Sequence, residues 1–213
     1  DIKNFYPSIR HKKVFEFFLY TQKCSPDVAS LLTKLTTRNY ALPLGTSTSP
    51  FLADQIISPI DSRIGNMAKL HGLTFTRYVD DLTLSGPFDL EDYAKQLLKI
   101  IQQNGFKISR NKLVFYRPGD GKERIITGVM VRDGQVYAPT SYVEWLAEEL
   151  RQAREVSRHS SGTREFDSKA QYQGRIAYVM WLDPSQGKRL LRLFRKVHWK
   201  HLEHITSLSA LVS

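Results

Sequence analysis

Apolar residues recur at steps of three and four positions in several parts of the chain, which is the spacing of a helix with one buried face. The clearest run extends from Phe51 to Leu70, after a hydroxyl-rich segment and Pro50, and it predicts a long helix that ends at His71-Gly72. The same spacing predicts shorter helices over residues 12–20, 26–37 and 89–104.

Short runs of β-prone residues lie between these helices. Residues 73–85 contain two runs on either side of Val79-Asp80-Asp81, which predicts two strands. We expect further strands in residues 1–9, ending in a turn at Pro7-Ser8, and in residues 106–108, 112–116 and 125–131, with turns at Pro118-Gly119 and Asp133-Gly134.

The second half of the chain is helical in pattern and basic in charge. From Ser141 onward the helical spacing is interrupted at residues 160–162 and at Asp183-Pro184. Residues 1–100 carry 12 basic and 10 acidic side chains, whereas residues 101–213 carry 19 and 11. The order of elements predicts an α+β fold. The basic excess indicates a polyanionic partner such as nucleic acid, with a merely basic soluble surface as the alternative.

The composition excludes several classes of protein. The 213 residues are 41% hydrophobic, as in globular proteins. They contain no apolar run of about 18 residues that could span a membrane. A single cysteine, Cys24, excludes an internal disulfide and a classical zinc cluster, and it fits a reducing cytoplasm. Because Asp1 stands inside a patterned segment, we expect further sequence upstream of it.

Two adjacent carboxylates, Asp80 and Asp81, lie between the strand-like runs of residues 73–85. An exposed hairpin turn would explain a bare Asp-Asp pair, but apolar residues flank this one on both sides. Asp1 begins another segment that we expect to be a strand. Three carboxylates converging from adjacent strands would suit two Mg²⁺ ions, which prefer hard oxygen ligands and together promote phosphoryl transfer.

Five segments resemble, in order, the motifs of reverse transcriptases. Tyr78-Val79-Asp80-Asp81 resembles the YxDD box of that family. Residues 1–9, DIKNFYPSI, resemble its first catalytic motif and are closest to the bacterial retron type. The remaining three are residues 42–50, LPLGTSTSP, similar to an LPQGxxTSP motif; residues 104–108, NGFKI, with Lys112; and Ile126-Thr127-Gly128, which resembles the retron VTG element near the primer grip.

The resemblance implies the architecture of a right-handed polymerase. Residues 1–117 would form the palm, an antiparallel sheet backed by helices, with the catalytic motifs. A primer-grip-like hairpin would follow over residues 118–140, and a basic helical thumb over residues 141–213. The fingers of the family would precede Asp1.

The resemblance also implies roles around the acidic residues. Asp1, Asp80 and Asp81 would hold two catalytic Mg²⁺ ions, or Mn²⁺ in their place, with the Ile2 carbonyl as a further ligand. Lys112 would protonate the leaving pyrophosphate, with an ordinary basic surface residue as the alternative.

Further residues would contact the nucleotide. Tyr6 aligns with the steric gate that excludes a ribose 2′-hydroxyl, and a core aromatic is the alternative. The backbone N–H groups of Asn4 and Phe5 would meet the triphosphate. Gly45 would let the backbone approach the nucleotide closely. Leu44 stands where the family has glutamine, so a polar contact near the nucleotide is lost.

Contacts with nucleic acid are expected in both halves of the chain. Arg77 is one candidate, with a solvated strand residue as the alternative. The others are Thr127 and Gly128 near the primer grip, and a one-sided basic stripe of the thumb consisting of Arg189, Arg192, Arg195, Lys196 and Lys200.

Two further groups carry weaker signals. His198, His201 and His204 are spaced three apart, and a basic helical face explains them better than a metal site does. Trp181, Trp199 and Tyr178 have the chemistry to stack on bases, but their helical spacing favours core packing.

The function implied by the resemblance is RNA-directed DNA synthesis by a cytoplasmic bacterial retron enzyme. It would copy a structured noncoding RNA, both template and primer, from dNTPs into a branched RNA–DNA product. It would act in antiphage defence with a toxin or effector protein and without membrane contact. Two alternatives stay open: another bacterial reverse transcriptase, of group II intron or abortive-infection type, and a non-catalytic nucleic-acid scaffold. The intact Asp1, Asp80 and Asp81 favour catalysis.

Overall fold

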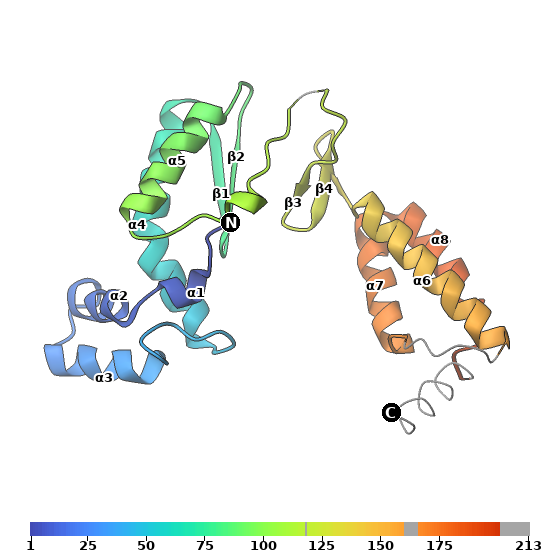
Figure 1. The fold of residues 1–213 in the computed structure, drawn as a ribbon, viewed down its shortest axis with the longest axis horizontal. Coiled ribbons are helices and arrows are strands. Elements are labelled where there is room, and N and C mark those ends of the chain that lie inside the picture. Colours follow the sequence, from blue (N-terminus) through green and yellow to red (C-terminus); the bar gives the residue numbers. More distant parts are fainter. Residues whose placement is uncertain (118, 160–165, 201–213) are drawn as a thin grey trace. The chain divides into compact units, whose positions relative to one another are not determined.

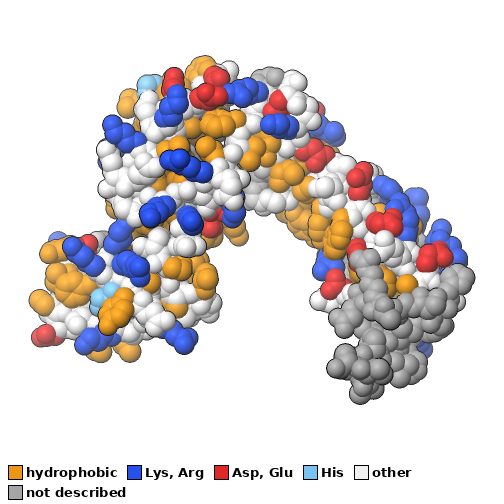
Figure 2. Space-filling model, in the orientation of Figure 1, with side chains coloured by type: hydrophobic (Ala, Val, Ile, Leu, Met, Phe, Trp, Pro, Cys, Tyr) orange, Lys and Arg blue, Asp and Glu red, His pale blue; other side chains and the backbone are white. Residues whose placement is uncertain are grey.

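The computed structural model describes residues 1–117, 119–159 and 166–200. The chain forms two compact units, Asp1–Asp120 and Gly121–Ser213, each with a hydrophobic core of its own (Figure 1). Helices combine with small antiparallel sheets, which confirms the α+β class. Lys and Arg side chains lie on the visible surface of both units (Figure 2).

The first unit combines a two-stranded antiparallel sheet with helices of very different length. The helices predicted over residues 12–20, 26–37 and 89–104 are confirmed, and the first of them ends in a π-helical turn over Phe17–Thr21. The elements in order are α1 Phe5–Ser8, α2 His11–Glu16, α3 Pro26–Thr36, α4 Thr48–Leu70, β1 Thr74–Tyr78, β2 Asp81–Ser85, α5 Glu91–Gln103 and a 3-10 turn Arg110–Lys112.

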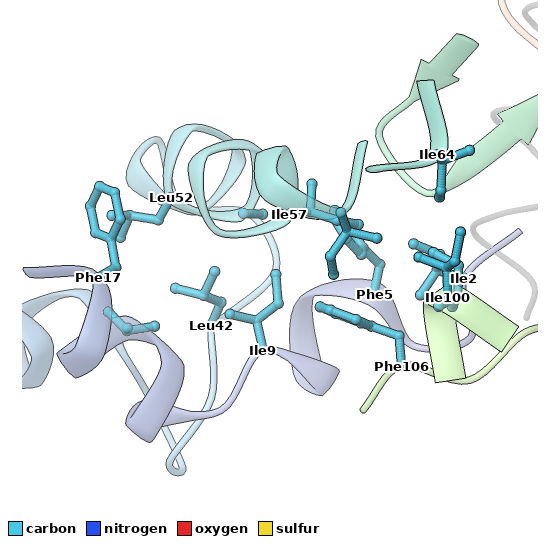
Figure 3. Packing of buried hydrophobic residues seen from close by; sticks show 14 of the residues in the cluster. Ile2, Phe5, Ile9, Phe17, Leu42, Leu52, Ile57, Ile64, Ile100 and Phe106 are labelled. Carbon is cyan, nitrogen blue, oxygen red and sulfur yellow. The ribbon is translucent and has the colours of Figure 1, made fainter. Parts of the chain in front are cut away.

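Helix α4 supplies one apolar face to the core of the first unit. It begins at Thr48, within the hydroxyl-rich segment, and ends at Leu70, as predicted. Pro50 falls in the first turn, where its missing N–H has no helical partner to lose. The buried residues of α4 pack in one cluster with residues from other segments such as Phe5, Ile9 and Phe106 (Figure 3). They recur with helical spacing: Leu52, Ala53, Ile57, Ile60 and Ile64.

Strands β1 and β2 form a tight antiparallel hairpin. The pairing extends from Thr74 opposite Ser85 to Tyr78 opposite Asp81, so Val79 and Asp80 alone form the connection. Val79 has a φ of 54°, a left-handed conformation that is costly for a β-branched residue. Strain of this kind costs about 1–3 kcal/mol and persists where the surrounding structure holds it in place.

The strand predicted over residues 1–9 is wrong for most of its length. Only Ile2 pairs, in a single antiparallel bridge with Ile108. Asn4 then adopts a left-handed conformation with a φ of 51°, and the chain turns into the short helix α1. The first segment is therefore a one-residue bridge followed by a helical turn.

Two further predicted strands are absent. Residues 106–108 contribute only the bridge at Ile108. Of residues 112–116, Lys112 ends the 3-10 turn, and none of the five belongs to a ladder in the described part of the chain. Leu113 and Val114 are exposed there. Their side chains therefore bury no apolar surface that would stabilise a strand at this position.

The second unit joins a three-stranded antiparallel meander to a set of helices. The strand predicted over residues 125–131 is in fact two strands, because Thr127 and Gly128, with φ of 47° and 87°, form a two-residue turn inside it. The turn predicted at Asp133-Gly134 is confirmed. The elements are β3 Ile125–Ile126, β4 Val129–Arg132, β5 Gln135–Tyr137, α6 Thr140–His159, α7 Lys169–Leu182 and α8 Pro184–Phe194.

Asp183 separates α7 from α8 and caps the second of them, which confirms the predicted break. Its carboxylate accepts hydrogen bonds from the Ser185 and Gln186 N–H groups, and Pro184 occupies the first position of α8. Burial raises the pKa of Asp183, but the hydrogen bonds from the Ser185 hydroxyl and from these two N–H groups lower it more, so the pKa lies below its ordinary value. The break predicted at residues 160–162 lies outside the described residues.

Gly187 allows α7 and α8 to approach closely. It is buried in α8, and a Cβ placed on it would lie 2.4 Å from the Cα of Met180 in α7. Backbone atoms cannot move aside as the end of a side chain can, so any side chain at this position would separate the helices. Gly174 in α7 provides a contrast, because nothing lies within 4 Å of a Cβ placed there.

Replacing Gly187 with Ala should lower the free energy of unfolding of the second unit by about 1–3 kcal/mol through overpacking. Gly174→Ala should raise it by about 0.5–1 kcal/mol, because alanine favours a helix and finds open space. Urea denaturation followed by tryptophan fluorescence measures this unit specifically, since its tryptophans are Trp145, Trp181 and Trp199. Similar effects of the two substitutions would contradict the close approach.

Candidate functional site

A backbone hydrogen bond joins the start of the chain to the turn between β1 and β2. The Ile2 N–H donates to the Asp80 carbonyl at 2.8 Å. Ile2 is 1% exposed, so its side chain is anchored in the core while its backbone meets the turn. Asp1 is therefore held next to Asp80, although the two are far apart in sequence.

The other side of this segment is bonded to residues 107–109. The Lys3 N–H donates to the Lys107 carbonyl at 2.8 Å, and the Ser109 N–H donates to the Asp1 carbonyl at 3.0 Å. The Asp1 carboxylate accepts from the Ser109 hydroxyl at 3.2 Å and from the Lys112 ammonium at 2.5 Å. Asp1 thus has backbone and side-chain partners in the same neighbouring segment.

Arg77 ties the turn to helix α4. Its Nε donates to both carboxylate oxygens of Asp61, at 3.0 and 2.8 Å, its Nη2 to Asp54 at 2.5 Å, and its Nη1 to the Val79 carbonyl at 2.8 Å. Burial lowers the pKa of Arg77, but the carboxylates of Asp61 and Asp54 raise it above its ordinary value. The side chain is 10% exposed, so it is not the solvated strand residue of the alternative interpretation. A contact with nucleic acid stays a prediction.

The acidic residues do not form a ready metal site. Among the residues that the structure describes, no three His, Cys, Asp or Glu side chains are grouped so that they could hold a metal ion. Asp1 and Asp80 line one cavity, whereas Asp81 is not among its lining residues. The donors have the hard oxygens that Mg²⁺ prefers. A divalent ion would have to displace the Lys112 ammonium from Asp1.

The cavity beside Asp1 and Asp80 is open and has a volume of about 1220 Å³. Tyr6 lines it and also packs against the core. Its role as a steric gate stays a prediction. Phe5 is 4% exposed, which leaves its backbone rather than its ring for a ligand. Asn4 is exposed beside the cavity in its left-handed conformation.

The loop before α4 reaches the same cavity through Leu44. Leu44 lines the cavity and is 72% exposed, whereas Gly45 is not among the lining residues. Gly45 has a φ of 82°, and nothing lies within 4 Å of a Cβ placed on it. Backbone conformation, not crowding, therefore accounts for glycine at this position.

Several cations that the motifs did not single out line this cavity too: Lys3, Lys107 and Arg110. In the sequence, these three residues were distinguished only by their position within or beside the segments that resemble the reverse transcriptase motifs. Their common location arises from the pairing of residues 1–3 with residues 107–109, which sequence spacing does not reveal.

The predicted nucleic-acid-binding residues of the second unit lie on its surface. Thr127 and Gly128 form the turn between β3 and β4, and the Tyr178 hydroxyl donates to the Gly128 carbonyl at 3.3 Å. The basic stripe is exposed along its whole length and consists of Arg189, Arg192, Arg195, Lys196 and Lys200.

The core packing predicted for three aromatic residues holds for Trp199 alone. Trp199 is 8% exposed, but Trp181 is 79% exposed and Tyr178 is 37% exposed. Trp181 extends from α7 into solvent, whereas Tyr178 is partly covered by the Tyr142 ring and bonds to the Gly128 carbonyl. His198 is exposed, and His201 and His204 lie outside the described residues.

Comparison with known proteins identifies the family. The family described as reverse transcriptase (RNA-dependent DNA polymerase) matches residues 1–174. The chain belongs to the reverse transcriptase family.

Reverse transcriptases of bacterial retrons are among the relatives of this family member. The retron Ec86 reverse transcriptase of Escherichia coli is 28% identical over 204 residues, covering 94% of this chain and 60% of the relative. The retron Mx65 reverse transcriptase of Myxococcus xanthus is 29% identical over 213 residues, covering 90% and 47%. The retron Se72 reverse transcriptase of Salmonella heidelberg (strain 579083-10) is 32% identical over 140 residues, covering 63% and 37%.

The resemblance to retron-type reverse transcriptases is thereby confirmed. The chain spans between 37% and 60% of the length of these curated relatives. In the described parts of this reverse transcriptase chain, no helix combines the length and apolar character needed to cross a bilayer.

Replacing Arg77 with Gln should destabilise the β1–β2 hairpin by about 1–3 kcal/mol, because Asp61 and the Val79 carbonyl lose their partner. Arg63→Gln is the matched control: Arg63 also lies on the first unit, but its hydrogen bond to Gln103 is exposed and 3.4 Å long. Hydrogen exchange of peptides from residues 73–86 measures the change. Equal exchange in both variants would show that Arg77 does not anchor the turn.

Proposed function

We propose that this member of the reverse transcriptase family acts as the RNA-directed DNA polymerase of a bacterial retron. The observation that carries the proposal is the backbone bond from Ile2 to Asp80, which sets Asp1 beside the YxDD-like turn on the wall of an open cavity. Nucleotidyl transfer requires acidic residues next to a space that admits a nucleotide. The relatives are reverse transcriptases of bacterial retrons, which supports the retron type.

Asp1, Asp80, Asp81 and the Ile2 carbonyl would hold two Mg²⁺ ions, with Mn²⁺ as a substitute. Two such ions stabilise the charge on the attacking and leaving oxygens of phosphoryl transfer. The chain itself would position these donors through backbone hydrogen bonds. Lys112 would leave the Asp1 carboxylate when a metal ion binds there. Lys112, once released from Asp1, would be free to donate a proton to the leaving pyrophosphate.

The remaining cavity residues would select and place the dNTP. The Tyr6 ring lines the cavity and would exclude a ribose 2′-hydroxyl. Backbone N–H groups of Asn4 and Phe5 would meet the triphosphate, and Gly45 would allow the loop before α4 to approach it. Leu44 supplies no polar group where the family has glutamine, so binding at this point depends on apolar contact.

In this proposal the two units have separate tasks. Residues 1–117 are the palm, residues 118–140 supply a hairpin that resembles the primer grip, and residues 141–213 are the thumb. The exposed basic stripe on and after α8, together with Thr127 and Gly128, would contact the phosphates of the template–primer RNA and its DNA product. Arg77, in the first unit, would have to leave Asp54 or Asp61 to make such a contact. The product would be a branched RNA–DNA molecule, made in the cytoplasm for antiphage defence with an effector protein.

Asp80→Asn and Asp81→Asn should each reduce DNA synthesis at least about a hundredfold, because the charge stabilisation supplied by a bound metal is worth several kcal/mol. RNA binding should change little, since neither residue belongs to the basic stripe. Primer extension in Mg²⁺ measures the activity, and fluorescence anisotropy measures the binding. Asp92→Asn is the control, an exposed carboxylate paired with Lys95 on α5. Full extension by either variant would refute the metal assignment.

Tyr6→Ala should lower the preference for dNTPs over rNTPs by roughly tenfold or more, because a bulky contact that rejects the 2′-hydroxyl is removed. Tyr6→Phe should keep the preference, since it keeps the ring. The ratio of kcat/KM for a dNTP and the matching rNTP is the measurement. An unchanged ratio in Tyr6→Ala would assign the ring to the core alone.

A further inference from the structure

A lysine of helix α2 reaches the end of helix α5, although the two helices are far apart in sequence. The Lys13 ammonium donates a hydrogen bond to the Asn104 carbonyl at 2.7 Å. It also lies over the ring of Phe106, 3.8 Å from the ring centroid. One side chain thus contacts two of the three residues, 104–106, at which the chain leaves α5 and enters the segment beside Asp1.

Helix α5 also ends through hydrogen bonds of its own. The Gly105 N–H donates to the Gln102 carbonyl at 2.9 Å. The Phe106 N–H donates to the Ile101 carbonyl at 3.2 Å. Together these two bonds form a Schellman motif, a common way to end a helix. Neither bond uses the Asn104 carbonyl, so the lysine adds a separate attachment, which joins this end of α5 to α2.

The attachment uses a cation that is half-buried, and burial is costly for an ammonium group. Burial lowers the pKa of Lys13 below its ordinary value, and the charge of Glu16 opposes this change only in part. The carbonyl and the face of the ring replace the water that the ammonium has lost. The next lysine on the same helix is different, because the Lys12 side chain is 85% exposed and meets only Glu16, at an N···O distance of 3.9 Å.

Phe106 connects this attachment to the segment that holds Asp1. Its ring is 2% exposed and lies beside the Phe5 ring, with 6.4 Å between the centroids (Figure 3). The three residues that follow it, 107–109, each pair with residues 1–3 through the backbone. Ser109 contacts Asp1 twice, through its N–H and through its hydroxyl. Three residues span at most about 10 Å, so a displacement of the ring would also displace the groups that hold Asp1.

We infer that Lys13 is a positioning residue, which fixes residues 104–106 and thereby holds the Asp1 carboxylate where nucleotidyl transfer requires it. Lys13 is not among the residues that line the cavity, so it acts through residues 107–109. A displacement of about 1 Å at a reacting group can lower a rate about a hundredfold. The effect on DNA synthesis rests on the proposed function, whereas the effect on the surroundings of Asp1 does not.

The first test measures hydrogen exchange by NMR at the Lys3 and Ser109 amides of the purified protein, without metal or dNTP. Lys13→Met removes the donor and the charge but keeps an unbranched chain that packs on an aromatic ring. Exchange should become about fivefold faster or more at both amides, because their hydrogen bonds belong to the segment that is released. Lys12→Met is the matched control, since it removes the same charge from the same helix, and it should exchange as the original protein does.

Primer extension is the second measurement. Lys13→Met should lower kcat about 10- to 100-fold and raise the Mg²⁺ concentration that gives half-maximal activity, with KM for dNTP changed less than about twofold. Lys13→Arg keeps a cation and a donor that stacks on aromatic faces, so it should recover most of kcat. A role in stability alone would lower the melting temperature and the folded fraction and leave the Mg²⁺ dependence unchanged.

The outcomes separate the explanations. If Lys13→Met and Lys12→Met exchange alike at Lys3 and Ser109, the lysine does not hold the surroundings of Asp1 and the inference is wrong. The inference is also wrong if exchange accelerates while kcat and the Mg²⁺ dependence stay as they are in the original protein. If the exchange rates differ as expected but the original protein extends no primer, the proposed polymerase function fails, whereas the control of Asp1 by Lys13 stands.

Discussion

The candidate site depends on the backbone hydrogen bonds that hold residues 1–3 between the β1–β2 turn and residues 107–109. These bonds use main-chain groups, so they form whatever the side chains carry. Their register is set by apolar neighbours: Ile2 and Phe106 are buried in the same core. A slip of one residue would turn Ile2 outward and bring a polar side chain into the core. Packing of apolar residues therefore holds Asp1 and Asp80 together against their mutual repulsion.

The turn that presents Asp80 is itself under strain, and the surrounding charges offset it. Val79 adopts a backbone conformation that disfavours β-branched residues. Arg77 bonds its carbonyl and, through Asp54 and Asp61, attaches the hairpin to α4. The long helix thus supports the site in two ways, through its apolar face toward the core and through its acidic residues toward the turn.

The features that the sequence predicted well are those set by local pattern. Helix α4, the break at Asp183-Pro184 and the two runs around the Asp-Asp pair follow from periodicity, capping and turn residues. The strand expected over residues 1–9 failed because its only partner, Ile108, is remote in sequence and because Asn4 leaves the extended conformation. Local pattern did not predict the ion pair of Asp1 with Lys112, because it depends on that long-range contact; only the resemblance placed both residues at one site.

Sums of charge over a segment hide where a polyanion can bind. Residues 1–100 are nearly neutral, with 12 basic and 10 acidic side chains, so the first half gave little sign of a basic surface. In the fold, however, Arg77 is paired with Asp54 and Asp61 and Lys95 with Asp92, while Arg10 and Arg38 line a groove whose lining includes no Asp or Glu. A phosphate gains most from cations that need not first leave a carboxylate. The position of cations in the fold is therefore a better guide to a polyanion site than the net charge of a segment.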